Sequence, residues 1–469
     1  VNEQDLNKGN YDDMHFPRFV YGMFKREQFY EALQNLPDFV EAIVLDRKIT
    51  KFHQPEEGKT ILSFEKPAQR ITFEKNEEGK IVQKNLDKTF DTVEAELKLI
   101  GIGSPEPSTI DKVKNEPNFF GSTTALKDGI EGSSFYEQFK SQALKIFKET
   151  GKKVELGIMG TGPSFLDMAN MIYNDKELRE AINITAISSS GISKTYPKDE
   201  EIKNYKPKHF KKGYTFTTIQ ELLEHAIDEV KHGLEQGVKP QVALRGGCRF
   251  GSILWGQLNE RQRKEFYEQV GAKQIDNLLN STTKETQMAL DNLDIKYIAA
   301  KIDAESIENQ DGKLKMNLST DHLQNDNFIR NPKASQNETE AKFDIVVNCM
   351  GFGKALEVDL LQDGLDKGFF QTVSDPTKRT GVEVNENMEI GNGAYMNGYL
   401  VAGTGYLKGQ PQLLNAVFAA SAKFAAKLGE QLFGKEQNLI IQRMSGKFIA
   451  PPNIEKFEAI EQSKGLGIG

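Results

Sequence analysis

The residues with the clearest chemical signature form the Gly160-Thr161-Gly162 turn. Apolar residues dominate 154–159 before it, and a helical pattern begins directly after it. In a strand–turn–helix unit the first glycine permits the tight turn. The second lets the main chain approach a pyrophosphate, which then meets the free N–H groups and the positive end of the helix. Phe165 stands where a third glycine is usual. The pattern predicts a dinucleotide phosphate site made by Gly160, Thr161, Gly162, Pro163 and Ser164.

The next strand pattern, 184–188, ends in a run of three serines. In a dinucleotide-binding unit, an acidic residue here takes the ribose 2′-OH of NAD, and an arginine accommodates the 2′-phosphate of NADP. Neither residue type is present. The hydroxyls of Ser188 and Ser189 can serve a 2′-phosphate together with nearby cations, so we expect NADP, with NAD also possible. The candidate cations are Lys194, Lys211 and Lys212.

A serine hydrolase is a different interpretation of the same turn, with Ser164 as the nucleophile. The nucleophile elbow of such enzymes requires a glycine two residues after the serine, and Leu166 occupies that position. The chain has six histidines and no obvious acid–histidine pair to activate a serine. We therefore treat the hydrolase as the least favoured alternative and assign no catalytic residue.

Two further groups of residues have weaker chemical signatures. His225 and His232, with Glu221 and Asp228, could in principle ligate a metal, but they fit better as the solvated face of a helix, and we expect no metal site. The segment 245–249 reads Arg-Gly-Gly-Cys-Arg and could hold a phosphate or carboxylate between two guanidiniums. A plain glycine-rich loop is the favoured interpretation there.

Composition restricts the class of protein. The 469 residues exceed a typical domain about threefold, so we expect two domains. The net charge of −8 argues against broad binding of nucleic acid or an anionic membrane. No apolar run approaches the roughly 18–20 residues of a membrane span. Two cysteines, Cys248 and Cys349, exclude a disulfide scaffold. We expect a soluble cytoplasmic protein that acts on a small-molecule substrate, of unassigned oligomeric state.

The chain around the turn shows two different patterns of apolar residues. Between 136 and 188, helical and apolar strand patterns alternate, which predicts a parallel sheet covered by helices. Between 60 and 100 the period is two, which predicts a small antiparallel β-meander. Thr218 and Glu221 form a capping box that opens a helix. The polar stretches 193–216 and 317–340 are expected to be loops that determine substrate specificity.

Four other segments, on either side of the glycine turn in the sequence, resemble known segments of flavoproteins. Leu99–Pro105 and Val346–Gly351 look like the strand-to-glycine crossings between the two dinucleotide-binding domains of flavoproteins. Gly398–Gly405 resembles a C-terminal flavin-binding segment. Phe16–Gly22 resembles an arginine-containing segment of the bacterial FAD/NAD(P)-binding protein family. Those proteins are distant relatives of class B flavin monooxygenases and of lysine and ornithine N-hydroxylases.

The resemblance implies cofactor contacts and a domain order. It assigns FAD or NADP contacts to Arg18, Gly351, Gly403, Thr404, Gly405 and Gln410. It implies an α/β fold of two nested, doubly wound Rossmann-type domains. The FAD-binding domain would comprise 1–135 and 341–469, and the NAD(P)-binding domain 136–340. The family opens with a strand and Gly-x-Gly-x-x-Gly, which this chain lacks before Arg18. We therefore expect that the first βαβ unit is missing and that the chain is cut short.

These observations predict a monooxygenase-like oxidoreductase dependent on FAD and NAD(P)H. Hydride would pass from NAD(P)H to the flavin, and then electrons to oxygen or another small-molecule acceptor. The cofactor supplies that chemistry, so the lack of a recognisable triad or acid pair is no objection. The competing class is a non-catalytic dinucleotide-binding sensor or interaction protein, which the missing first fingerprint would suit.

Overall fold

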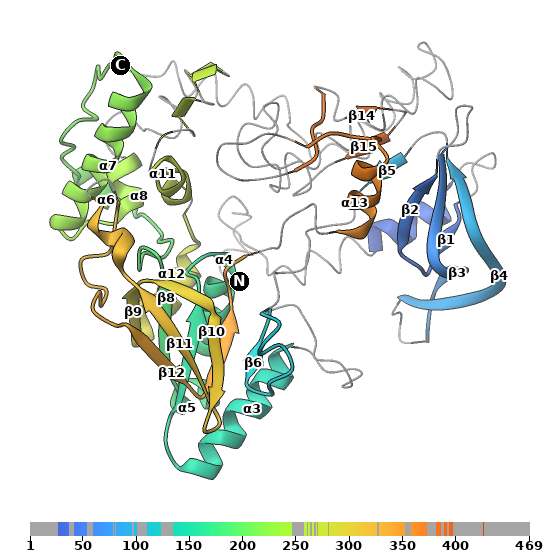
Figure 1. The fold of residues 1–469 in the computed structure, drawn as a ribbon, viewed down its shortest axis with the longest axis horizontal. Helices are drawn as coiled ribbons and strands as arrows, with labels where there is room; N and C mark the ends of the chain where they lie inside the picture. The colour runs from blue at the N-terminus through green and yellow to red at the C-terminus, as the bar shows by residue number, and fades with distance from the viewer. Residues whose placement is uncertain are drawn as a thin grey trace. The chain divides into compact units, whose positions relative to one another are not determined.

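A computed structural model of the chain is shown in Figure 1. It describes residues 27–36, 42–53, 60–77, 79, 81–95, 98–100, 110–122, 135–245, 258–259, 261–262, 265–266, 269, 271–279, 281–325, 328–351, 358–372, 381–385, 389–391, 394–396 and 425. The chain separates into two compact units. The parallel-sheet unit holds the described residues from Pro105 to Gly353, and the meander unit holds those of 18–104 and 354–469.

A five-stranded parallel sheet forms the centre of the parallel-sheet unit. Its strand order is β6-β13-β7-β8-β9, and every neighbouring pair is parallel. The strands are β6 (Phe119–Phe120), β13 (Ile345–Asn348), β7 (Val154–Met159), β8 (Ile182–Ser188) and β9 (Ile295–Ala299). The predicted domain 136–340 omits β6 and β13, which belong to this sheet. Their partners lie far away in sequence, so no local pattern marks the pairing.

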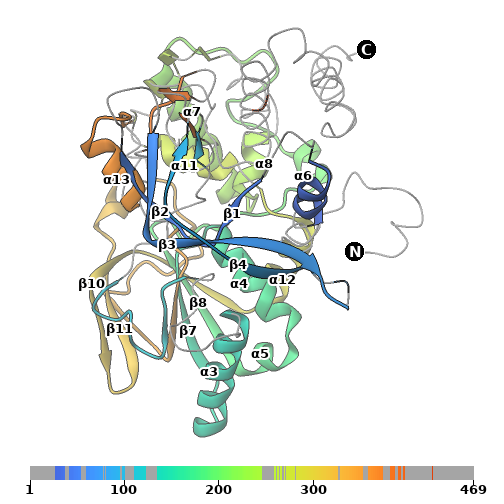
Figure 2. The same ribbon diagram turned by 90° about the vertical axis from the view of Figure 1, so that its right-hand side faces the viewer.

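The two faces of this sheet are covered differently. Alternate residues, such as Leu156 and Ile158, pack on the helical side. That side carries α3 (Phe135–Thr150), α4 (Pro163–Asn174), α5 (Lys176–Ala181) and α12 (Lys284–Asn292). Intervening residues, such as Met159 and Val346, pack against an antiparallel sheet. Its strands are β10 (Lys301–Gln310), β11 (Lys313–Ser319) and β12 (Glu340–Phe343). Figure 2 shows α3 and α5 on one side of β7 and β8, with β10 and β11 on the other.

The doubly wound prediction therefore requires a correction. A doubly wound sheet has helices on both faces, whereas here one face carries a second sheet. Gly157 shows why the second sheet fits. A β-carbon at Gly157 would lie 2.5 Å from the Phe343 ring of β12, so only glycine lets that ring rest on β7. The parallel β–α–β prediction is correct, and the second covering layer is a finding of the tertiary structure.

Asp175, at the start of α5, forms hydrogen bonds that hold this helix against α3. Its carboxylate accepts hydrogen bonds from the Tyr136 hydroxyl (2.6 Å), Lys140 Nζ (2.8 Å) and the Leu178 amide (3.2 Å). Burial alone would raise the pKa of Asp175, but the hydrogen bonds from Lys140, Tyr136 and Leu178 lower it to about 2. The charged carboxylate therefore stabilises the contact between these two helices.

We expect Asp175→Asn to lower the free energy of unfolding at pH 7 by about 2 kcal/mol. Because the folded pKa is depressed, the stabilisation is fully present above pH ~4. It is lost as pH falls through about 2. Urea unfolding of wild type and variant should therefore converge near pH 2. Glu180→Gln, at an exposed position on the same helix, is the control. Curves that stay equally far apart down to pH 2 would contradict this account.

A helical cluster follows β8 in the chain. It comprises α6 (Asp199–Asn204), α7 (Ile219–Glu235), α8 (Pro240–Arg245) and α11 (Ala272–Leu279). Half of the predicted capping box is present at α7: the Glu221 amide donates to Thr218 Oγ1 at 3.1 Å. The Glu221 carboxylate accepts, at 2.7 Å, from the amide of Thr217, one residue before the N-cap residue. A 3₁₀ turn, η2 (Asp321–Gln324), lies in the predicted loop 317–340. Among the described helices, none combines the length and apolar character that crossing a bilayer requires.

The meander unit confirms the predicted antiparallel sheet. β3 (Thr60–Lys75) pairs with β1 (Val44–Leu45), β2 (Ile49–His53) and β4 (Ile81–Ala95). A second sheet contains β5 (Lys98–Ile100), β14 (Glu389–Gly391) and β15 (Ala394–Met396). Helix α13 (Asp359–Asp366) shares a core with β2. Within the described residues of this unit, β5–β15 is the one parallel pair, so they contain no second Rossmann sheet.

Candidate functional site

The predicted glycine turn lies where the strand order of the parallel sheet reverses. From β7 the chain continues to β8 and β9 on one side, whereas β13 pairs with β7 on the other. Ligands of open parallel sheets bind outside the carboxyl ends of the strands at this kind of reversal. The Gly160 amide donates to the Ile187 carbonyl at 2.7 Å, and the Cys349 amide donates to the Met159 carbonyl at 2.8 Å. The turn is thus held between β8 and β13.

Gly160 is required by both its backbone and its surroundings. Its φ is +96°, in a region that L side chains rarely adopt. A β-carbon there would lie 2.6 Å from the carbonyl oxygen of Cys349. The main chains of the turn and of β13 therefore come closer than any side chain allows. The tight turn expected at this glycine is present, and β13 also approaches it closely.

The helix that follows begins with an open N-terminus. Gly162 is the N-cap residue of α4, with no side-chain cap, and Pro163 occupies the first helical turn. The first N–H groups of a helix have no partner within it and carry partial positive charge. Among the described residues other than its chain neighbours, none places an atom within 4 Å of where a β-carbon of Gly162 would stand. The amide groups around Ser164 and Phe165 can therefore meet an anion at this end of the helix.

Phe165 explains the departure from the three-glycine fingerprint. Its side chain is fully buried in the helical face of the sheet and lies edge-on to Tyr297 of β9, with 6.2 Å between ring centroids. A third glycine normally permits close packing of the helix on the strands. Here a large aromatic ring fills that interface instead. The substitution changes the packing of α4 and leaves the turn and the helix N-terminus in place.

The hydroxyl groups of Thr161 and Ser188 are engaged within the protein. Thr161 Oγ1 donates to the Ile192 carbonyl at 2.6 Å and lies 3.0 Å from Ser188 Oγ. Ser188 Oγ also accepts a hydrogen bond from the Gly191 amide at 3.1 Å. These bonds tie the glycine turn to the loop after β8. Because the Thr161 hydroxyl is used in these bonds, the main-chain amides of the turn are the groups available to bind a phosphate.

The loop after β8 is fastened by a segment that carried no motif in the sequence. His322 Nε2 donates to the Ser189 carbonyl at 2.7 Å. The Asn331 amide donates to the Ser190 carbonyl at 2.9 Å, and its side chain donates to the Gly191 carbonyl at 3.1 Å. The predicted loop 317–340 therefore lies beside the serines. Sequence reasoning missed this because the contact joins positions about 140 residues apart.

Two cations come with that segment, on either side of Asn331. Arg330 and Lys333 are exposed, and neither forms an ion pair with a carboxylate among the described residues. Arg330 donates to the Leu323 carbonyl at 2.9 Å. The lysines named from the sequence are placed differently. Phe210 anchors the segment of Lys211 and Lys212 in the core of the helical cluster, and Lys194 already has a partner.

The end of β13 completes the described part of the site. Gly351 has φ +108°, and no described residue beyond its chain neighbours comes within 4 Å of a β-carbon built on it. Met350 beside it is 51% exposed, and the Cys349 side chain is buried. Burial, with a smaller contribution from Asp167, raises the pKa of the Cys349 thiol, as befits an unreactive core residue. The other predicted cofactor contacts lie outside the described residues: Arg18, Gly403, Thr404, Gly405 and Gln410.

The alternative sites of the sequence analysis have other neighbours. His225 Nδ1 is 2.8 Å from the Tyr214 hydroxyl, and His232 is 2.7 Å from the Gln236 side chain. In the part of the chain that the structure describes, no group of three or more His, Cys, Asp or Glu residues is arranged to hold a metal. Nor is any described histidine hydrogen-bonded to Ser164.

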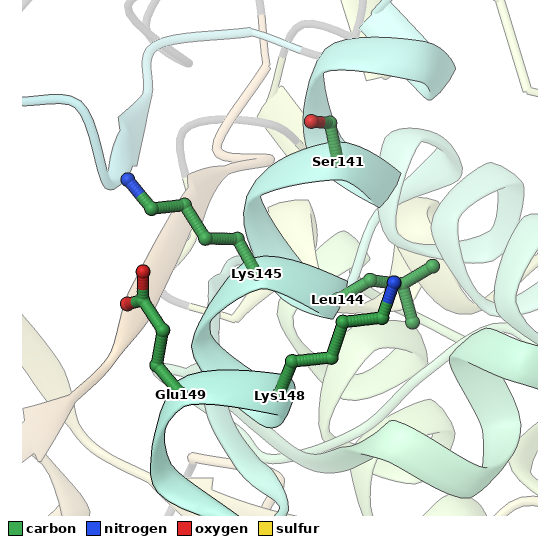
Figure 3. Close-up of a pocket in the computed structure, with 5 residues that line it drawn as sticks. All are labelled: Ser141, Leu144, Lys145, Lys148 and Glu149. Carbon is green, nitrogen blue, oxygen red and sulfur yellow. The ribbon is translucent and has the colours of Figure 1, made fainter.

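A surface hollow on α3 is separate from this site. Its volume of about 530 Å³ is within the range of ligand pockets. Among the described residues, its lining comes from one helix: Ser141, Leu144, Lys145, Lys148 and Glu149. Figure 3 shows the two lysine side chains extending in different directions from the helix. Polar groups do not converge there, so we assign it no ligand.

Comparisons with known proteins give distant structural likeness only. No family model matches the chain, and no curated protein matches it. Among solved structures, the chain is similar to ornithine hydroxylase from Pseudomonas aeruginosa, at 10% identity and a TM-score of 0.36 over 81% of this chain and 70% of that one. The chain is also similar to the reduced form of that enzyme, at 8% identity and a TM-score of 0.41, over 90% of this chain and 79% of that one.

Proposed function

We propose that the parallel-sheet unit binds a pyridine dinucleotide across the carboxyl ends of β7 and β13. The single observation that carries the proposal is the Gly160–Gly162 turn. It lies at the strand-order reversal and leads into a helix N-terminus that has no side-chain cap. The pyrophosphate would lie on the amides of Ser164 and Phe165, where the helix field favours negative charge. The adenosine ribose would then reach the loop after Ser188.

We further propose that the dinucleotide is NADPH. The loop after β8 offers no carboxylate for a 2′-OH, and it is flanked by Arg330 and Lys333. A 2′-phosphate there would gain charge-assisted hydrogen bonds, which are roughly twice as strong as neutral ones. NADH lacks the 2′-phosphate, and both cations would stay solvated in its complex. We therefore expect NADH to bind more weakly than NADPH, but still to bind.

Removing these cations should change cofactor preference. We expect Arg330→Ala with Lys333→Ala to weaken NADPH binding about 10- to 100-fold. NADH binding should change less than about threefold, because that cofactor lacks the 2′-phosphate. Titration calorimetry with both cofactors measures the ratio. Lys153→Ala, an exposed lysine before the amino end of β7, is the matched control. An equal loss for both cofactors would count against 2′-phosphate recognition.

The resemblance extends the proposal to a flavin-dependent, monooxygenase-like oxidoreductase. Bound FAD would accept hydride from NADPH and pass electrons to oxygen or another small-molecule acceptor. The protein's own part is to hold the dinucleotide by its backbone amides and to shield the reacting rings from water. Apart from Gly351, the residues to which the resemblance assigns FAD or NADP contacts lie outside the described part, so this step rests on the sequence motifs.

Absorbance spectroscopy tests the flavin step directly. We expect the purified chain, alone or after addition of FAD and gel filtration, to carry the visible bands of bound flavin. Anaerobic NADPH should then bleach those bands. A chain that binds NADPH by calorimetry but retains no FAD would instead support the non-catalytic dinucleotide sensor. A chain that binds neither would remove both functions.

A further inference from the structure

Arg245, at the end of α8, is a half-buried cation without an acidic neighbour. Its Nη2 donates to Ser281 Oγ at 3.0 Å. Among the described residues, no carboxylate lies within ion-pair distance of its guanidinium. The nearby Lys239 is different, because Glu201 pairs with it at 3.0 Å. A neutral hydroxyl does not offset the charge of a guanidinium withdrawn from water, so Arg245 is prepared for an anion.

The surroundings of Arg245 favour negative charge. Ser281 lies two residues before Thr283, the N-cap residue of α12, and the positive end of that helix is therefore close to the same hydroxyl. Within the described part of the chain, Tyr196 is the titratable group near enough to influence Arg245 electrostatically. Burial lowers the pKa of Arg245, which reflects the missing counterion and leaves the group charged at neutral pH.

The position of Arg245 links it to the candidate site. Thr161 of the glycine turn donates to the Ile192 carbonyl, and Thr195, three residues later, is hydrogen-bonded to Gln241 of α8. Three extended residues span at most roughly 11 Å, and Gln241 and Arg245 are about one helical turn apart. Residues 192–196 thus connect the glycine turn to Arg245 over a distance that one small molecule can span. Leu244 and Ile192 pack in the same apolar cluster.

We propose that Arg245 and Ser281 form an oxyanion-binding subsite beside the dinucleotide site. It would hold the carboxylate or phosphate of a small molecule bound along the carboxyl edge of the parallel sheet. The planar guanidinium retains donors beyond the bond to Ser281, and these match two oxygens of one carboxylate or phosphate. The subsite does not depend on which redox cofactor the protein uses. Its ligand group could come from the substrate or from the cofactor.

Anion binding by the full chain tests the subsite. Acetate, glutarate and inorganic phosphate would be titrated by calorimetry, with the rise in melting temperature as a second readout. We expect saturable binding of at least one probe and at least a tenfold loss in Arg245→Gln. Arg179→Gln removes an arginine that lies over the Tyr173 ring, and it should bind like wild type. Equal affinities in wild type and Arg245→Gln, or no binding by wild type, would overturn the proposal.

Two further comparisons show whether the bound anionic group belongs to the cofactor or to the substrate, and provide variants in case Arg245→Gln does not fold. A parallel loss of NADPH and phosphate binding in Arg245→Gln would assign the subsite to the cofactor. Unchanged NADPH binding with lost carboxylate binding would assign it to the substrate. If Arg245→Gln does not fold, Arg245→Lys retains the charge without the fork, and Ser281→Ala removes the hydroxyl. Both should weaken anion binding several-fold without lowering stability, and full affinity in both would again overturn the proposal.

Discussion

Gly160→Ser should lower the free energy of unfolding by about 2–5 kcal/mol, whereas Gly162→Ser, two residues later, should not. At Gly160 the left-handed backbone costs roughly 1–2 kcal/mol for any L side chain. The overlap with the Cys349 carbonyl, 2.6 Å from the new β-carbon, adds to that cost. At Gly162, φ is −81° and the space for a β-carbon is open. A serine there is a favourable N-cap residue, so stability should stay equal or rise slightly.

The same pair separates folding from binding. In Gly162→Ser, the new hydroxyl would cap the helix amides and compete with the pyrophosphate, so the NADPH dissociation constant should rise about tenfold. Urea unfolding and calorimetry together give both quantities for each variant. Unchanged NADPH affinity in Gly162→Ser would contradict the proposed phosphate site. A Gly160→Ser variant as stable as wild type would contradict the close approach of β13.

Glu229→Ala should be the most destabilising change in the helical cluster, at about 3–5 kcal/mol. The Glu229 side chain is fully buried on α7 and accepts four hydrogen bonds. Its donors are the Tyr205 hydroxyl (2.5 Å) and the amides of Lys208 (2.9 Å), His209 (2.7 Å) and Phe210 (3.1 Å). Burial and the neighbouring carboxylate raise the pKa of Tyr205, so it remains a donor. Alanine would leave the three amides without their acceptor, and the Tyr205 hydroxyl with only the main-chain carbonyl of residue 229, 3.3 Å away.

Equilibrium urea unfolding monitored by circular dichroism measures this loss. Glu229→Gln retains one oxygen but places an amide donor against other donors, so an intermediate loss is expected. Glu224→Ala, at an exposed position of the same helix, should stay within about 0.5 kcal/mol of wild type. If Glu229→Ala unfolds at the same urea concentration as Glu224→Ala, the carboxylate does not hold this loop as described.

The local features of the parallel-sheet unit were predictable because short-range chemistry specifies them. The apolar run before Gly160 and the proline after Gly162 predicted β7, the turn and α4, all of which the structure contains. Thr218 and Glu221 predicted the start of α7. Asp311 and Gly312, a residue pair typical of tight hairpins, both adopt positive φ between β10 and β11. Each of these depends on residues within a few positions of one another.

The arrangement around the site was decided by the tertiary structure. Nothing near Gly157 indicates that Phe343 rests on it, and nothing in the Asn-rich stretch indicates that Asn331 holds the loop after Ser188. Arg245 was part of a predicted glycine-rich loop and instead ends a buried helix beside Ser281. Turn residues and periodicity act through neighbouring bonds, so the sequence by itself determined the glycine turn and its strand and helix. Pairings between distant strands and loops depend on which surfaces are left to bury, and only the folded chain resolves them.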